Sequence, residues 1–64
     1  MFVIYGRYTA DEKFRLINME SGDFVTKIIE ASVFWDETKE DMYHIIDRLT
    51  ELNPFMEFEF RRVK

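Results

Sequence analysis

Apolar and polar residues alternate in short runs through the N-terminal half of the chain. Residues 2–8 (FVIYGRY), 14–19 (FRLINM) and 24–29 (FVTKII) are rich in β-branched and aromatic side chains, as strands are. Polar residues 9–13 separate the first two runs. Residues 20–23 (ESGD) separate the next two, and their Ser-Gly pair allows the positive φ of a tight hairpin turn. The pattern predicts three strands joined in antiparallel order.

The spacing of apolar residues becomes helical after residue 38. One stripe lies at helical spacing and comprises Met42, Ile45, Ile46, Leu49 and Leu52. Asp36 or Thr38 can act as the N-cap that accepts hydrogen bonds from free amides. The Asn53-Pro54 pair ends the helix, because the residue before a proline disfavours helical backbone angles. These signals predict one helix that runs to about Asn53.

Residues 55–63 alternate again and predict a closing strand. Met56, Phe58 and Phe60 would face one way, and Glu57, Glu59 and Arg61 the other. The order βββαβ predicts a single α+β domain over residues 1–64, with one helix packed on one face of a three- to four-stranded, mainly antiparallel sheet. We place the closing strand beside the first strand and parallel to it, because the helix carries the chain back over the sheet.

The strands carry more apolar side chains than one helix can cover. A two-residue Ser21-Gly22 loop would pair Met19 with Phe24 and put apolar groups on both faces of the hairpin. The face away from the helix would carry Val3, Tyr5, Ile17, Met19, Phe24 and Trp35. Because apolar patches beyond a few hundred Å² commonly mark interfaces, we predict that this face binds a partner. The alternative is a moderately apolar face that charged side chains such as Arg15 and Glu57 screen.

Composition narrows the possible chemistry. The 64 residues include no cysteine and one histidine, which excludes disulfides and leaves too few ligands for an ordinary zinc site. The net charge of −4 disfavours contact with nucleic-acid phosphates. The chain has neither an apolar stretch long enough to span a membrane nor a signal-peptide pattern at its start. We expect a cytoplasmic protein without a cofactor.

The titratable residues fit a solvated helix better than an active site. His44 lies between Glu40 and Asp47 at helical spacing, and no Ser or Cys nucleophile stands in a recognisable motif. We therefore predict that the chain is not an enzyme. Carboxylates gather where the helix begins, but without the spacing of a calcium loop. We predict that Glu37, Glu40 and Asp41 steer a basic partner toward the protein.

Nucleic-acid binding is the alternative function. Aromatic side chains on a sheet can stack on bases, and Tyr5 and Phe24 with Arg15 or Lys27 could form such a platform. The acidic net charge opposes this reading, so we keep a small RNA- or single-stranded-DNA-binding domain as the second hypothesis.

The sequence EKFRLINMESGDFVTKI, followed by Ala31-Ser-Val-Phe34, a short acidic helix and a closing strand, resembles small proteins encoded by bacteriophages and mobile elements. The resemblance covers most of the chain and brings no site motif, so it assigns no functional residue. It implies a bacterial or phage cytosol, where some proteins of this size block host defence nucleases. We therefore predict a non-enzymatic module that inhibits or modulates a host protein, for example a defence component, by occlusion. Homodimerisation through the open sheet face is a further expectation.

Overall fold

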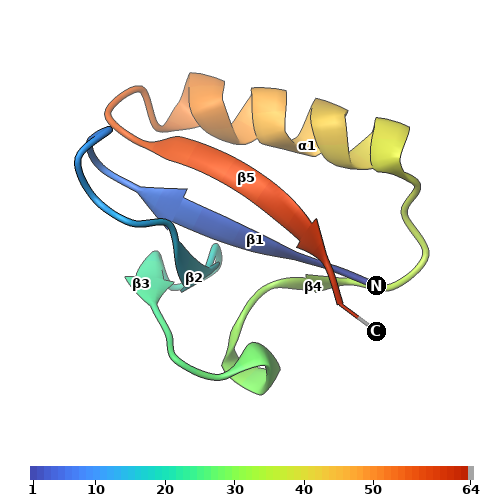
Figure 1. The fold of residues 1–64 in the computed structure, drawn as a ribbon. Helices are drawn as coiled ribbons and strands as arrows, with labels where there is room; N and C mark the ends of the chain where they lie inside the picture. The colour runs from blue at the N-terminus through green and yellow to red at the C-terminus, as the bar shows by residue number, and fades with distance from the viewer. Residues whose placement is uncertain (64) are drawn as a thin grey trace.

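The computed structural model describes residues 1–63 (Figure 1). The elements in chain order are β1 (Phe2–Arg7), β2 (Arg15–Asn18), β3 (Asp23–Phe24), the 3-10 helix η1 (Ile28–Glu30), β4 (Val33–Phe34), α1 (Lys39–Leu52) and β5 (Glu57–Arg62). One helix packs against a curled antiparallel sheet, with a strand first and a strand last. The predicted α+β class and βββαβ order are confirmed, and the short strand β4 is an addition to them.

Strand β1 is the centre of the sheet. β5 pairs with all of β1 along one edge, from Phe2 opposite Arg62 to Arg7 opposite Glu57. The other edge of β1 is shared, since β4 pairs with its first residues and β2 with its last. β3 pairs with the outer side of β2. The long β1–β5 pair is therefore the frame to which the shorter strands attach.

The closing strand lies beside β1 as predicted, but its predicted parallel direction is wrong. β5 runs antiparallel to β1. The reason is β4, which pairs antiparallel with β1 through Phe2 opposite Phe34 and so adds one reversal of the chain before α1. Because α1 then carries the chain back, β5 runs in the same direction as β4 (Figure 1). A strand of two residues has no detectable period, so the sequence pattern does not reveal this reversal.

The predicted third strand is shorter than residues 24–29, and its register differs. β3 ends at Phe24, and residues 28–30 form η1. Ile17 lies opposite Phe24, so the hairpin loop spans residues 19–22 instead of two residues. Gly22 takes φ 77° in this loop, as the Ser-Gly signal predicted. A shift of two residues preserves which side chains share a face, because side chains alternate with period two.

The helix follows its predicted signals closely. Thr38 is the N-cap, and its hydroxyl accepts from the Asp41 N–H while the Asp41 carboxylate accepts from the Thr38 N–H. Asn53 is the C-cap, directly before Pro54. Met42 is fully buried, and the rest of the apolar stripe except Leu52 packs against the core. Helix α1 therefore covers the sheet with the stripe that the sequence predicts.

The core lies between α1 and the sheet. Its buried members are Phe2, Ile4, Ile17, Met42 and Phe58. Gly6 allows the closing strand to pack tightly, because a Cβ there would lie 3.3 Å from Met56 Cε and 3.4 Å from Phe58 Cδ1. Phe58 thus packs beneath α1, as the alternation of the closing strand predicted.

Candidate protein-interaction site

The six apolar residues predicted to form one open face do not form it. Val3 and Ile17 are buried. Tyr5, Met19 and Phe24 are half-buried, and Trp35 is exposed. Val3 and Ile17 expose only 0% and 1% of their surfaces, so neither can contact a partner without unfolding. The prediction of a single exposed apolar face is therefore wrong.

The register between β1 and β2 explains this error. Tyr5 lies opposite Leu16, so these two share a face, and Ile17 points to the other face with Ile4. Met19 and Phe24 pack against the same core cluster as Ile17. Of the predicted residues that lie in or beside β1, β2 and β3, only Val3 and Tyr5 remain on the face away from α1. The sequence pattern set the faces within the hairpin but contained no signal for its register against β1, and a slip of one residue reverses every side chain.

Charged side chains screen the face away from α1. The Arg61 guanidinium lies 3.9 Å from the centre of the Tyr5 ring, and its Nε donates to Glu59 Oε1 at 3.0 Å. The hydrogen bonds to Glu59 raise the pKa of Arg61. Arg7 lies 4.1 Å from the centre of the Phe14 ring. The alternative expectation, in which charged neighbours screen a moderately apolar face, therefore describes this surface.

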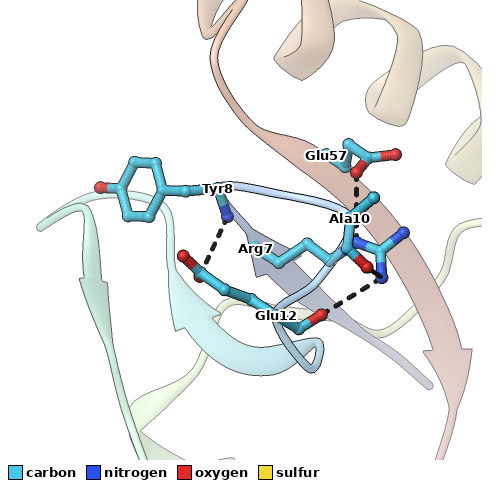
Figure 2. Close-up of polar contacts among 5 residues, drawn as sticks. All are labelled: Arg7, Tyr8, Ala10, Glu12 and Glu57. Carbon is cyan, nitrogen blue, oxygen red and sulfur yellow. Dashed lines mark hydrogen bonds and ion pairs between the residues drawn. The ribbon is translucent and has the colours of Figure 1, made fainter.

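Arg7 also joins three segments of the chain (Figure 2). Its Nε donates to Glu57 Oε1 of β5 at 3.2 Å, and its Nη1 donates to the backbone oxygens of Ala10 and Glu12, both at 3.2 Å. The Tyr8 N–H donates to Glu12 Oε2 at 3.4 Å. These bonds order the loop between β1 and β2, which is a structural role and leaves the Arg7 guanidinium occupied.

The aromatic platform considered for base stacking is not assembled. Tyr5 lies on the face away from α1, whereas Phe24 packs against the core cluster. The Arg15 guanidinium covers the Phe24 ring at 3.8 Å from its centre, and Tyr8 meets the same ring edge-on at 5.8 Å. Two rings on different faces cannot stack on neighbouring bases of one strand.

Trp35 is the predicted anchor that the fold leaves available. It follows β4 directly and exposes 72% of its surface. The connection that carries it is short and held at both ends, by the pairing of β4 with β1 and by the Thr38 cap of α1. A large ring is therefore presented to solvent from a well-supported segment.

Carboxylates follow this segment in the sequence, and one of them completes the cap of α1. Hydrogen bonds from the Thr38 backbone and hydroxyl lower the pKa of Asp41, which completes the capping box. Glu37 Oε2 accepts from the Asp36 N–H at 3.2 Å. Glu40 is exposed in the first turn of α1. Of the three predicted steering residues, Asp41 thus has a structural role, while Glu37 and Glu40 lie beside Trp35 along the chain.

Other exposed apolar residues were not predicted as contact residues. Ile29, Phe55, Leu52 and Tyr43 each expose more than half of their surface. Ile29 was assigned to a strand but lies in η1, and Phe55 was assigned to the closing strand but lies in the turn before β5. Phe55 directly follows the helix-stopping Pro54, and that position was a usable signal of a turn.

A groove runs between α1 and β5, and we call it the α1–β5 groove. It has a volume of about 480 Å³. Its lining residues are Phe2, Lys39, Tyr43, Ile46, Phe58, Glu59, Phe60 and Arg62. Tyr43 meets Phe60 edge-on at 5.1 Å, and Phe60 meets Phe2 at 5.4 Å. These edge-to-face contacts give the groove an aromatic floor, and Lys39, Glu59 and Arg62 add charged groups to its lining.

A second hollow of about 460 Å³ lies against α1, lined by His44, Ile45, Asp47, Arg48, Leu49 and Glu51. None of these lining residues is a Ser, Thr or Cys that could act as a nucleophile. Within residues 1–63, no three His, Cys, Asp or Glu side chains gather closely enough to hold a metal ion. In the same residues, no helix combines the length and apolar character needed to cross a membrane.

Comparison of the chain with protein-family models, with curated proteins and with solved structures finds no match.

Proposed function

We propose that this chain is a non-enzymatic protein-binding module that uses Trp35 as its apolar anchor. The observation that carries the proposal is the 72% exposure of this ring on a segment held at both ends. Tryptophan is among the residues that most often dominate binding energy, because its large ring fills a pocket on the partner. A fixed segment loses little conformational freedom on binding, which favours affinity.

The carboxylates near Trp35 define the chemistry of the partner. Glu37 and Glu40 lie within five residues of the ring, and the chain as a whole has a net charge of −4. Such a surface attracts a partner whose pocket has a basic rim, and rim charges mainly raise the rate of association. The proposed partner is therefore a protein with an apolar pocket bordered by Lys or Arg.

The biological setting is part of the same proposal. We infer an origin in a bacteriophage or mobile element, action in the bacterial cytoplasm, and a host protein, for example a defence component, as the target. Binding would act by occlusion, since a chain of 64 residues can cover a functional surface of a larger protein.

The anchor can be tested by capture from a bacterial lysate with immobilised protein. Trp35→Ala should lose the captured host protein while its thermal unfolding midpoint stays within the range of surface substitutions. Phe55→Ala is the matched control, because it also truncates an exposed aromatic residue, 84% exposed, at another position. Retention of the same captured protein by Trp35→Ala would overturn the assignment of this anchor.

The steering residues call for a kinetic measurement with the purified partner. The double variant Glu37→Gln, Glu40→Gln should slow association and weaken its salt dependence, while dissociation changes little. Glu51→Gln, in the last turn of the same helix, is the control for a general loss of negative charge. An association rate equal to that of the wild type in low salt would remove the two carboxylates from the proposal.

A further inference from the structure

Strand β5 has a free edge. It pairs with β1 on one side, and among residues 1–63 no strand pairs with its other side. The Val63 N–H donates to the Met1 oxygen at 2.9 Å and so continues the β1–β5 ladder. Backbone groups of successive residues point to opposite sides of a strand. The N–H and C=O groups of Phe58, Phe60 and Arg62 therefore point away from β1, toward the free edge.

This edge has only one of the features that usually prevent strand addition, its charged side chains. Natural edge strands are blunted by proline, by charged side chains such as lysine, by bulges or by being very short. β5 has six residues, EFEFRR, with neither Pro nor Lys, and all six are paired in unbroken register with β1. A regular strand of this length can accept another strand along its whole edge.

The charges of β5 are self-complementary when two copies run antiparallel. Its first half carries Glu57 and Glu59, and its second half carries Arg61 and Arg62. An antiparallel copy brings the acidic half of one strand against the basic half of the other, whereas a parallel copy would set like charges side by side. Opposite charges across a pair of strands stabilise it, and like charges destabilise it.

We propose that a second copy of this chain pairs with β5 through this edge, in an antiparallel register centred on Phe60. In this register Glu59 of each copy lies opposite Arg61 of the other, and Phe58 lies opposite Arg62. The residues that exchange hydrogen bonds are then the ones whose backbone groups point outward. The arrangement is a two-fold symmetric contact, in which the same patch serves both copies.

Neighbouring registers are disfavoured by the same charges. A two-fold axis perpendicular to the sheet passes between one residue and the same residue of the second copy. Odd-numbered residues then face odd-numbered residues, and even-numbered residues face even-numbered ones. A shift of the axis by one residue from Phe60 therefore places it at Glu59 or at Arg61. Centring on Glu59 sets two glutamates opposite each other at the axis, and centring on Arg61 does the same with two arginines. The charge pattern therefore selects Phe60.

The α1–β5 groove lies on the helix side of this contact. Tyr43 exposes 61% of its surface above Phe60, which it meets at 5.1 Å. With Phe60 at the two-fold axis, the Phe60 rings of both copies meet, and each brings its Tyr43 with it. Burial of these rings supplies an apolar centre for an interface whose other face carries the alternating Glu59 and Arg61 charges.

Charge reversal tests the register directly. Glu59→Arg sets like charges opposite Arg61 of the second copy, and Arg61→Glu does the same opposite Glu59. Each variant alone should raise the dissociation constant of the dimer by about tenfold or more, because two favourable pairs become repulsive. The two variants mixed should form a heterodimer, and the double variant should dimerise again. Sedimentation equilibrium over a range of concentrations gives each constant, and circular dichroism confirms that each variant is folded.

Arg62→Pro is a second test of the pairing between the copies, and it leaves the charge pairs intact. Its N–H points to the free edge, so proline removes hydrogen bonds between the copies and keeps the β1–β5 ladder. This variant should be a folded monomer. A wild-type chain that stays monomeric at the highest soluble concentration would overturn the proposal. A dimer that survives Arg62→Pro, or single variants that show no heterodimer when mixed, would overturn it equally. None of these outcomes depends on Trp35 or on a host partner.

Discussion

The two halves of the sheet are built in different ways. The β1–β5 half has an unbroken ladder of six residue pairs beneath α1. The other half, which consists of β2, β3, η1 and β4, has only two paired residues at each contact of its strands. The comparison shows that a short chain can complete its sheet with very little strand pairing when something else holds the segments.

Side-chain hydrogen bonds hold the second half. The Asn18 Oδ1 accepts from the Glu20 N–H at 2.9 Å and from the Ser21 N–H at 3.2 Å, and its Nδ2 donates to the Glu30 oxygen at 2.8 Å. The Ser32 Oγ accepts from the Met19 N–H at 2.8 Å. These bonds replace ladder bonds that the short strands cannot make, because backbone groups need partners wherever they are removed from water.

Removing a core ring from the β1–β5 half should have the largest effect. Phe58→Ala is expected to lower the free energy of unfolding by about 3 to 5 kcal/mol, since it leaves a cavity beneath α1. That is a large share of the stability of a domain of this size. Urea unfolding measures the loss, and amide exchange should accelerate in both halves together. Phe55→Ala is the control, with a change of about 0.5 kcal/mol or less. Faster exchange confined to β2 and β3 would contradict the central role of this half.

Removing the Asn18 side chain should destabilise the half with the short strands and leave the β1–β5 half unchanged. Asn18→Ala loses three hydrogen bonds at a partly exposed site, with an expected cost of about 1 to 2 kcal/mol. Amide exchange should accelerate over residues 19–32 and stay unchanged in β1 and β5. Asn53→Ala is the matched variant in the other half, where the side chain makes one bond, to the Leu49 oxygen at 2.9 Å. An equal cost for the two variants would mean that Asn18 has no special role in the short strands.

Removing the helix cap should weaken the β1–β5 half moderately. Thr38→Ala leaves the Asp41 N–H without its side-chain acceptor, and loss of such a cap costs about 1 kcal/mol. Thermal unfolding measures the change, and Thr38→Ser should recover most of it because the hydroxyl is restored. A Thr38→Ser variant as unstable as Thr38→Ala would place the effect in the lost methyl group instead.

The smallest expected effect is a dependence on pH at the same cap. The pKa of Asp41 is lowered from 3.8 by its bonds to Thr38, so the carboxylate binds fewer protons in the folded chain than in the unfolded chain. Its stabilising contribution is present above pH 3.8 and is lost as the pH falls through the lowered pKa. The difference in unfolding midpoint between the wild type and Asp41→Asn should therefore shrink on acidification. A difference that is constant with pH would show that this carboxylate does not titrate with folding.

The candidate contact surface was predicted only in part. Trp35 was predicted on the open sheet face and Glu37 and Glu40 at the start of the helix, and the fold leaves all three accessible to some degree. Ile17 was placed on the same surface and is buried, because the face on which it lies depends on strand register. Val3 is buried although it lies on the predicted face. The placement of the closing strand beside the first strand, at an edge of the sheet, was predicted, whereas its antiparallel direction was not.

Local chemistry alone determined several features of this protein. The apolar stripe of α1, the Thr38 cap, the Asn53-Pro54 stop and the alternation that puts Phe58 under the helix each depend on residues close together in the sequence. Only the tertiary structure decided the direction of β5, the existence of β4 and the pairing of Tyr5 with Leu16. These depend on how distant segments meet, and a segment of two residues or a register between strands leaves no periodic trace in the sequence.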